Sequence, residues 1–254
     1  MANVLLDFDG VLFQNKRIHE IIKEKSVDYV SRRLRISRQT ADTINTHHYR
    51  HFGHTTLHLP KGTLRSYNRE VFGTLDWDLV HDCITDDDRR RMGTYFHMAN
   101  LFPYINHYIF SNAPFDYCSK ITNATGYDLS DLVNPNVFTS DIISDKLGAD
   151  FLKPLPHTYA YVQAFFHGDG DERRLRKKQC PLFFLDDSPI NLLPLVHNSM
   201  WNTHHINTKK YKHNPIDAAV DADMHYDTQD DTHYYAHDDI HHIYQAILNK
   251  LTSK

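Results

Sequence analysis

Two aspartates, Asp7 and Asp9, end an apolar run in the stretch NVLLDFDGVLF, with Gly10 directly after them. Two carboxylates placed so close together repel each other, so the pair calls for a compensating positive charge such as a bound cation. An aspartate carboxylate can also act as a nucleophile toward phosphorus and form an aspartyl-phosphate. This stretch therefore predicts a cation site with the chemistry of phosphoryl transfer.

Three further stretches carry side chains of matching chemistry. IFSNAP contains Ser111 and Asn112, FLKPLP contains Lys153, and FFLDDSPIN contains Asp186 and Asp187. A hydroxyl, backbone amides and an ammonium group can hold phosphoryl oxygens, while carboxylates suit Mg²⁺. Each stretch alone has an ordinary interpretation as a turn, a helix cap, a loop or a surface lysine. Their combination, in this order along the chain, predicts one catalytic site.

The elements that must position these side chains alternate between strand and helix. Nearly continuous apolar runs predict strands buried on both faces of a parallel sheet at residues 3–8, 107–112 and 180–187, with weaker strands at 137–139 and 204–206. Proline at or near the first turn predicts helices at residues 114–125, 156–167 and 189–198. This alternation predicts an α/β fold in which the candidate residues follow the carboxyl ends of strands, Lys153 after the third. An extended segment would also put Asp7 and Asp9 on the same side, facing the cleft.

Residues 14–100 show no strand signal and predict a helical insertion between the first two strands of the sheet. Ser37 and Thr63 are predicted helix caps, and one apolar stripe is predicted to stop at Gly53. The predicted inward faces are Ile18, Ile22, Val30 and Leu34, then Ala41, Ile44, His48 and Phe52, then Leu64, Tyr67 and Val71. The final stretch, Asp86–Asn100, is expected to return to the sheet as a helix.

Composition places the chain among ordinary globular proteins. It has 254 residues, 41% of them hydrophobic, and a net charge of −4. This balance argues against a partner that is a nucleic acid polymer or a membrane surface. No apolar stretch approaches the roughly 18 residues of a membrane span, and because a strand pattern begins within three residues, we expect no signal peptide. Three cysteines without a CxxC pair indicate free thiols, so we expect a cytoplasmic protein.

The sequence contains 20 histidines, several of them clustered around His47 and His48. Their spacing matches no closed zinc pattern, so structural or surface roles are expected. The basic run at residues 172–178 is expected to be a surface turn. The acidic, His-rich carboxy-terminal segment is expected to be a loop followed by a helix from about Ile240.

The stretches DFDGVLF, IFSNA, KPLP and FFLDDSPIN resemble, in this order, the four motifs of the haloacid dehalogenase (HAD) superfamily of phosphotransferases. The resemblance runs from Val4 to about Ile206. RIHEIIKE and LRISRQTADTINTHHYRHFG are also similar to cap segments of the pyrimidine 5'-nucleotidase-like branch. The resemblance implies a Rossmann-like open parallel sheet as the core domain, residues 1–13 and 86–254. It also implies a helical cap domain, residues 14–85, inserted after the first strand.

The resemblance further implies the roles of the site residues. Asp7 would be the nucleophile and Asp9 the general acid and base. Ser111 and Lys153 would bind the phosphoryl group, helped by the backbone of Asn112. The implied Mg²⁺ ligands are the Asp7 carboxylate, the Asp9 carbonyl and Asp187, with Asp186 as a further ligand or a support for the others.

The cap is expected to select the substrate. Arg50, His51 and His54 are candidates to reach the cleft, whereas His48 and Phe52 are expected to face the core of the cap. A ring stacked on a nucleobase would suit a nucleoside 5'-monophosphate; alternatively, this segment only packs the cap. The sequence departs from the nucleotidase-like branch at two places. It has DGVLF in place of a DNCLY-like turn, and it lacks a second glycine near Gly53. The identity of the leaving group therefore stays open.

The leading hypothesis is a Mg²⁺-dependent phosphatase that acts through an aspartyl-phosphate on a small phosphate ester, with a nucleoside 5'-monophosphate favoured, as a monomer or homodimer. The alternatives are a sugar-phosphate phosphatase, a phosphomutase and a catalytically idle HAD-fold binding module. A dehalogenase would use the same first aspartate, but a halide leaves without an acid, so Asp9 argues against it.

Overall fold

The fold was analysed in a computed structural model of the chain. The structure describes residues 2–60, 62–132, 137–147, 150–167, 181–206, 234–237, 244–245 and 247–249. The basic run at 172–178 and most of the His-rich carboxy-terminal segment lie outside these residues, as does Cys180. Cys83 and Cys118 are free thiols, as predicted. In the described part of the chain, no helix is both long enough and apolar enough to cross a bilayer.

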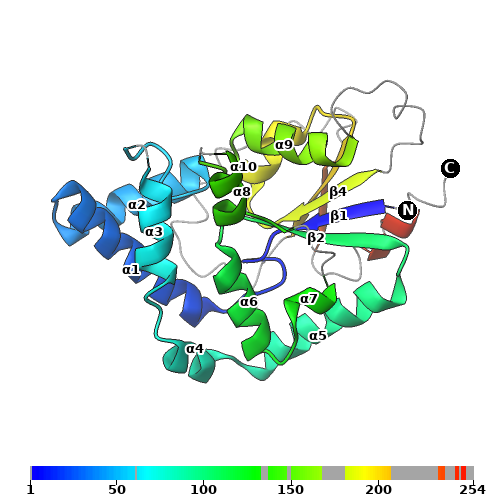
Figure 1. The fold of residues 1–254 in the computed structure, drawn as a ribbon, viewed down its shortest axis with the longest axis horizontal. Coiled ribbons are helices and arrows are strands. Elements are labelled where there is room, and N and C mark those ends of the chain that lie inside the picture. Colours follow the sequence, from blue (N-terminus) through cyan, green and yellow to red (C-terminus); the bar gives the residue numbers. More distant parts are fainter. Residues whose placement is uncertain are drawn as a thin grey trace.

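A parallel sheet forms the centre of the molecule (Figure 1). Its described strands follow the order β3-β2-β1-β4-β5-β6, and each neighbouring pair is parallel. The strands are β1 Ala2–Leu6, β2 Ile105–Ser111, β3 Phe138–Thr139, β4 Leu182–Asp186, β5 Trp201–Ile206 and β6 Tyr234–His237. Every residue of β1 and β4 is buried, because helices cover both faces of the sheet. The prediction of an α/β fold with a parallel sheet is confirmed.

Alternate side chains of the strands enter two separate hydrophobic clusters. Val4 and Leu6 join the cluster with α5 (Asp86–Leu101), α6 (Phe115–Ala124) and α7 (Leu129–Leu132). Leu5, between them, joins the cluster with α8 (Ser140–Leu147), α9 (Pro156–His167) and α10 (Pro189–Leu192). The two sets of helices lie on opposite sides of the sheet in Figure 1, so the fold has three layers.

The helical insertion lies at the carboxyl ends of the strands, to the left of the sheet in Figure 1. It consists of α1 (Lys16–Leu34), α2 (Arg38–Phe52), α3 (Thr63–Tyr67), a π-helical segment (Asn68–Phe72) and α4 (Trp77–Cys83). Many of its buried apolar residues, among them Val30 and Val71, belong to the same cluster as one face of the sheet. The division into a core domain and a cap domain stays a prediction, but the helical nature of the insertion is confirmed.

The predicted helix boundaries are mostly confirmed, with two corrections. Ser37 caps α2 by accepting from the Thr40 amide, and Gly53 ends it at a φ of 75°. The prediction of a Thr63 cap is wrong, because the chain enters α3 through Gly62 in the left-handed region, and the Thr63 hydroxyl donates to the Pro60 carbonyl. The helix predicted at 189–198 is also shorter than expected. It changes to a 3₁₀ turn at Leu193–Leu195, where Pro194 has no amide proton to continue it.

Asn15 joins the beginning of the insertion to its end. Its Oδ1 accepts from the Ile18 amide at 3.0 Å and caps α1. Its Nδ2 donates to the Cys83 carbonyl at 2.8 Å and to Asp88 Oδ2 at 2.7 Å. Because Asn15 is buried, these partners have no ready substitute in water.

We therefore predict that Asn15→Ala lowers the free energy of unfolding by about 1–3 kcal/mol, measured by urea denaturation. Ser37→Ala, which removes a cap at an exposed site, is the matched control and should lower it by about 1 kcal/mol or less. An Asn15 variant no less stable than the Ser37 variant would show that the link does not stabilise the fold.

Candidate active site

The strand order creates a crevice at one edge of the sheet. In the sheet, β2 lies on one side of β1 and β4 lies on its other side. The direction of the strand order therefore changes between β1 and β4, and the crevice opens at their carboxyl ends. Asp7 follows β1, Ser111 ends β2 and Asp186 ends β4. A cavity of about 520 Å³ opens here, with Asp7, Asp9, Ser111 and Asp187 in its lining. Three of the four predicted stretches thus line one cavity, and Lys153 of the fourth contacts Asp7 and Asp186.

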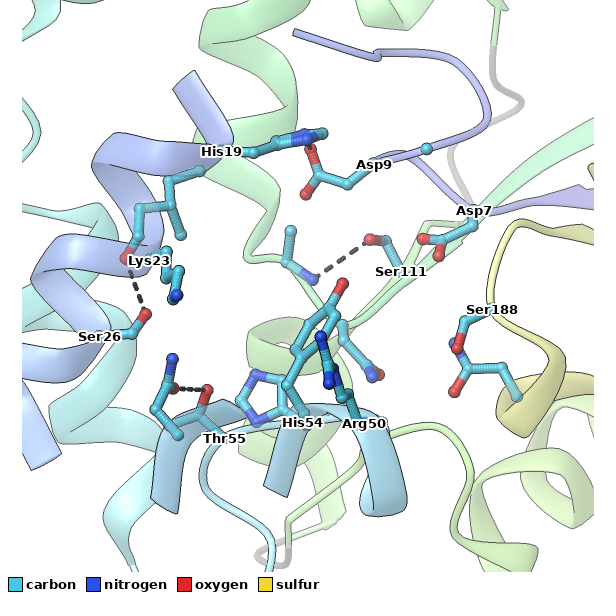
Figure 2. A pocket seen from close by; sticks show the side chains of 18 of the residues that line it. Asp7, Asp9, His19, Lys23, Ser26, Arg50, His54, Thr55, Ser111 and Ser188 are labelled. Carbon is cyan, nitrogen blue, oxygen red and sulfur yellow. Dashed lines mark hydrogen bonds and ion pairs between the residues drawn. The ribbon is translucent and has the colours of Figure 1, made fainter. Parts of the chain in front are cut away.

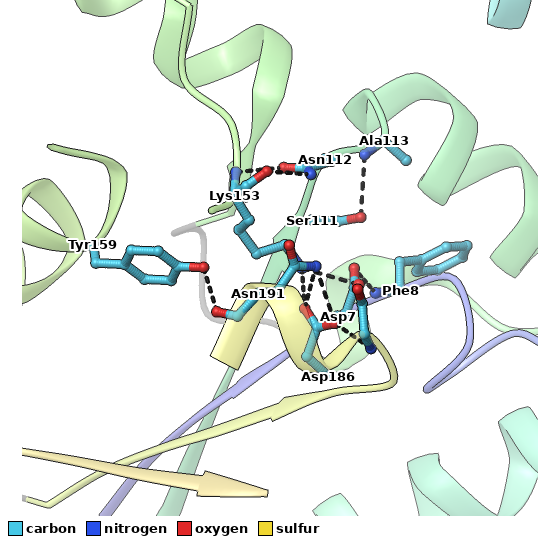
Figure 3. A network of polar contacts seen from close by, with 10 residues as sticks. Asp7, Phe8, Ser111, Asn112, Ala113, Lys153, Tyr159, Asp186 and Asn191 are labelled. Atoms are coloured by element: carbon cyan, nitrogen blue, oxygen red, sulfur yellow. Dashed lines mark hydrogen bonds and ion pairs between the residues drawn. The ribbon is translucent and has the colours of Figure 1, made fainter. Parts of the chain in front are cut away.

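Lys153 lies at the centre of the polar network beneath this cavity (Figure 3). Its Nζ is 2.9 Å from Asp7 Oδ2 and 2.5 Å from Asp186 Oδ2, and its side chain is fully buried. Burial alone would lower the pKa of Lys153, but the charges of Asp186 and Asp7 outweigh it and raise the pKa. The lysine is therefore a fixed positive charge between two carboxylates.

The Asn112 side chain fixes the backbone of Lys153. Its Nδ2 donates to the Lys153 carbonyl at 2.9 Å, and its Oδ1 accepts from the Lys153 amide at 2.8 Å. The prediction placed Lys153 after the third strand. In the structure, helix α8 lies between β3 and Lys153, so the strand end itself does not position the lysine. A side chain from the end of β2 positions it instead.

Asp186 is enclosed by donors. Its Oδ1 accepts from the Ser188 amide at 2.8 Å, and Asn191 Nδ2 lies 3.1 Å from both carboxylate oxygens. Together with Lys153, these contacts satisfy a carboxylate that has no exposure to solvent. Asp186 thus orients the lysine and the start of α10. The sequence analysis did not identify Asn191 as a site residue, because it is only the last residue of the stretch FFLDDSPIN.

Three carboxylates form a candidate cation site. Asp7, Asp186 and Asp187 each place one oxygen within 4.8 Å of the others. Burial raises the pKa of Asp7 to about 7, opposed by Lys153 and reinforced by Asp186. Burial likewise raises the pKa of Asp187 well above its ordinary value. One ammonium does not balance three carboxylates, so this set of hard oxygen donors fits a divalent cation.

The turn after β1 differs from the extended segment that was predicted. β1 ends at Leu6, and the amides of Leu12 and Phe13 both donate to the Phe8 carbonyl at 3.0 Å. These hydrogen bonds close a turn where the chain leaves the sheet. The apolar side chains of the turn are buried. Asp9 still lines the cavity, but the turn places it there and strand alternation does not.

Asp9 is held by residues from two helices, His19 ten positions away in sequence and Tyr117 108 positions away. Its Oδ1 is 3.1 Å from His19 Nε2 on α1 and accepts from the Tyr117 hydroxyl of α6 at 2.9 Å. Burial lowers the pKa of His19, but the hydrogen bond and charge of Asp9 outweigh it and raise the pKa. Figure 2 shows His19 beside Asp9 at the edge of the cavity. No local pattern in the sequence identifies either partner.

The cap candidates are not all brought to the cavity. Arg50 and His54 line it, whereas His51 is exposed and its ring centroid lies 4.4 Å from that of His47. His51 follows Arg50 directly, and adjacent positions of a helix point in different directions. The expectation for His51 is therefore corrected. Buried lining residues that the prediction missed include Ser26, Asn45 and Thr55.

No protein-family model matches the sequence, and no curated protein matches it. Solved structures with a similar course of the chain include a HAD phosphatase from Thermococcus onnurineus, 16% identical, covering 97% of this chain and 98% of that one, with a TM-score of 0.44. The putative HAD-hydrolase YfnB from Bacillus subtilis, bound to magnesium, is 13% identical with the same coverage and a TM-score of 0.47. The L-2-haloacid dehalogenase from Xanthobacter autotrophicus with chloropropionic acid covalently bound is 13% identical, again with 97% and 98% coverage, and has a TM-score of 0.45. The activity therefore has to be argued from the site.

Gly10 tests how closely the turn packs on the site. It has a φ of 84°, and a Cβ added there would lie 2.1 Å from the Asp187 carboxyl carbon. Gly126 is a matched control, because its φ is 92° but an added Cβ would meet no atom within 4 Å. Both alanine variants carry a left-handed strain of about 1–2 kcal/mol, and only Gly10→Ala adds a clash of about 1–3 kcal/mol.

We predict that Gly10→Ala lowers the free energy of unfolding by more than Gly126→Ala does, measured by urea denaturation in EDTA. Equal losses in the two variants would mean that the turn does not pack against Asp187.

Proposed function

We propose that this protein is a Mg²⁺-dependent phosphomonoester hydrolase that acts on a small phosphorylated molecule, with a nucleoside 5'-monophosphate as the favoured substrate. The observation that carries the proposal is the buried Asp7 carboxylate at the sheet end of the cavity, 2.9 Å from the ammonium of Lys153. Asp9, Ser111 and Asp187 line the same cavity. A nucleophile, a proton donor and groups that bind phosphoryl oxygens are thus within one small space.

Asp7 is oriented for attack on phosphorus. Its Oδ1 accepts from the Phe8 amide at 2.7 Å, and its Oδ2 faces Lys153. An Asp7 oxygen forms a bond to phosphorus while the ester oxygen leaves, which gives an aspartyl-phosphate and an alcohol. Water then attacks the phosphorus, releases inorganic phosphate and restores the carboxylate.

In the proposed reaction the Ser111 hydroxyl contacts the phosphoryl oxygens, whereas Lys153, fully buried beneath the cavity, acts on them only through its charge. The ammonium of Lys153 compensates the charge on them as it does that of Asp7. Ser111 Oγ accepts from the Ala113 amide at 3.2 Å, so its own proton remains to be donated to a phosphoryl oxygen. The fit of the carboxylates to a cation supports Mg²⁺ as a second positive group, which would be held by Asp7, Asp187 and the Asp9 carbonyl. When bound, it supplies charge neutralisation of the carboxylates and the phosphoryl group.

Asp9 moves the protons in this proposal. Both of its hydrogen bonds, from His19 and Tyr117, go to Oδ1, so Oδ2 is left to exchange a proton with the substrate. It protonates the leaving ester oxygen in the first step and takes a proton from water in the second.

The direct test is the release of inorganic phosphate from p-nitrophenyl phosphate and a metabolite panel, with Mg²⁺ or with EDTA. We expect Asp7→Asn to abolish turnover with an unchanged circular dichroism spectrum, and Asp9→Asn to slow turnover by about 10²- to 10⁴-fold. Turnover in Asp7→Asn would remove the nucleophile from the proposal. Absence of metal-dependent release from every substrate would favour a binding module without catalysis.

Mg²⁺ binding should be linked to protons. Because burial raises the pKa of Asp7 to about 7, this carboxyl is largely protonated at pH 6 and largely ionised at pH 8. A cation needs the ionised form, so its affinity should fall by up to about tenfold per pH unit below the pKa, with release of a proton on binding. Isothermal titration calorimetry in two buffers of different ionisation enthalpy measures both effects. An affinity that is constant from pH 6 to pH 8 would contradict the prediction.

A further inference from the structure

The part of the cavity inside the helical insertion ends in a set of neutral polar side chains, which we call the cap floor. Its members are Ser26 of α1, Asn45 of α2, His54 and Thr55 of the loop after α2, and Tyr67 of α3. Each of them is at most 6% exposed. Figure 2 shows His54 and Thr55 across the cavity from Asp7 and Asp9. The cap floor therefore faces the part of a substrate that does not react.

His54 belongs to the cap floor as a neutral hydrogen-bond donor. Its Nδ1 accepts from the Thr56 amide at 3.2 Å and lies 2.9 Å from Thr56 Oγ1. The ring proton must then be on Nε2, which has no hydrogen-bond partner in the described part of the chain. Burial, which lowers the pKa of His54 to about 3, agrees with this neutral form.

Asn45 provides a second donor. Its Oδ1 accepts from the Thr55 hydroxyl at 2.7 Å, which orients the amide. Among the residues that the structure describes, its Nδ2 has no partner, although the side chain is only 4% exposed. Because Asn45 lines the cavity, this Nδ2 can donate to an acceptor on a ligand bound there.

Tyr67 provides an acceptor. Ser26 Oγ donates its one proton to the Ile22 carbonyl at 2.8 Å, so the Tyr67 hydroxyl, 2.8 Å away, donates to Ser26. The Tyr67 hydroxyl also contacts the Thr55 side chain, which leaves one lone pair of the Tyr67 oxygen available to a ligand. The cap floor thus offers donors and an acceptor, all of them uncharged.

Two cationic side chains border the cap floor, Lys23 beside Ser26 and Arg50 beside His54 (Figure 2), but neither is buried. The ammonium of Lys23 is 3.1 Å from Asp42 Oδ1 and its side chain is 53% exposed, so it is at the mouth. Arg50 is half-buried. At the opposite end, Asp7 and Asp9 are acids. An anionic group placed on the cap floor would therefore lose water without gaining a buried cation.

We propose that the cap floor binds the leaving group of the substrate through neutral hydrogen bonds. The preferred substrates are phosphomonoesters whose leaving group is uncharged and carries hydrogen-bond acceptors, such as the carbonyls of a nucleobase or the hydroxyls of a sugar. A second anionic group in the leaving group is disfavoured. This inference rests on the proposed phosphatase function for the other end of the cavity.

Three aryl phosphates of similar shape test the proposal. 4-Carbamoylphenyl phosphate carries a neutral amide, 4-carboxyphenyl phosphate carries an anion in its place, and phenyl phosphate carries neither. In the wild type we expect kcat/KM for the amide to exceed that for the carboxylate by at least about tenfold, chiefly through KM. Equal values, or a preference for the carboxylate, would overturn the proposal. A nucleoside 5'-monophosphate and ribose 5-phosphate, compared in the same assay, distinguish a base from a sugar as the bound group.

Asn45→Leu, which removes the amide at similar size, should reduce the preference for the amide over phenyl phosphate severalfold. Thr55→Val, which frees the Asn45 carboxamide to rotate, is a second variant in case the first does not fold. Asn123→Leu, the same change at an exposed position of α6, should keep the wild-type preference. An amide preference that survives both cap-floor variants would refute the inference. Failure of the wild type to hydrolyse any of the esters would instead refute the phosphatase function, and this inference with it.

Discussion

The buried ion pairs of Lys153 are the interaction on which the rest of the site depends. An ammonium with no solvent exposure needs compensating charge, and Asp7 and Asp186 provide it at 2.9 and 2.5 Å. The same contacts decide how the two acids differ. Asp186 is surrounded by the donors of Ser188 and Asn191, whereas Asp7 has one oxygen on a backbone amide and faces the cavity. Two carboxylates held by one lysine therefore have different tasks, one supporting and one exposed to a ligand.

The helical insertion is joined to this centre at several places. Asp9 accepts from His19 of α1 and from Tyr117 of α6, so the turn after β1 is held by both the insertion and the sheet. Gly53, at the end of α2, lies so close to the sheet side that an added Cβ would be 2.9 Å from Asn191 Oδ1. Asn191 in turn contacts Asp186. The wall of the cavity that the insertion forms and the wall that the sheet side forms are thus joined through a few buried polar atoms.

Much of this architecture could be predicted because it follows from local patterns. The apolar runs that became β1, β2 and β4 are buried on both faces, and α9 begins and ends at the predicted residues. The Asp, Ser and Lys residues could be grouped because the carboxyl ends of parallel strands meet at one edge. The errors came where the chain leaves regular structure. The turn after Leu6 and the entry into α3 through Gly62 depend on backbone hydrogen bonds that apolar periodicity does not report.

By itself, the sequence determined the α/β order of elements, the helical insertion and the acids, hydroxyl and lysine that meet at one edge of the sheet. Only the tertiary structure decided the partners of each of these groups. Asp9 accepts a hydrogen bond from Tyr117, 108 positions away in the sequence, and Asn112 hydrogen-bonds the Lys153 backbone, 41 positions away. It also decided that Arg50 and His54 line the cavity and that His51 does not. The physical reason is that burial, protonation and hydrogen bonding depend on atoms a few ångströms away in space, whereas periodicity records only neighbours along the chain.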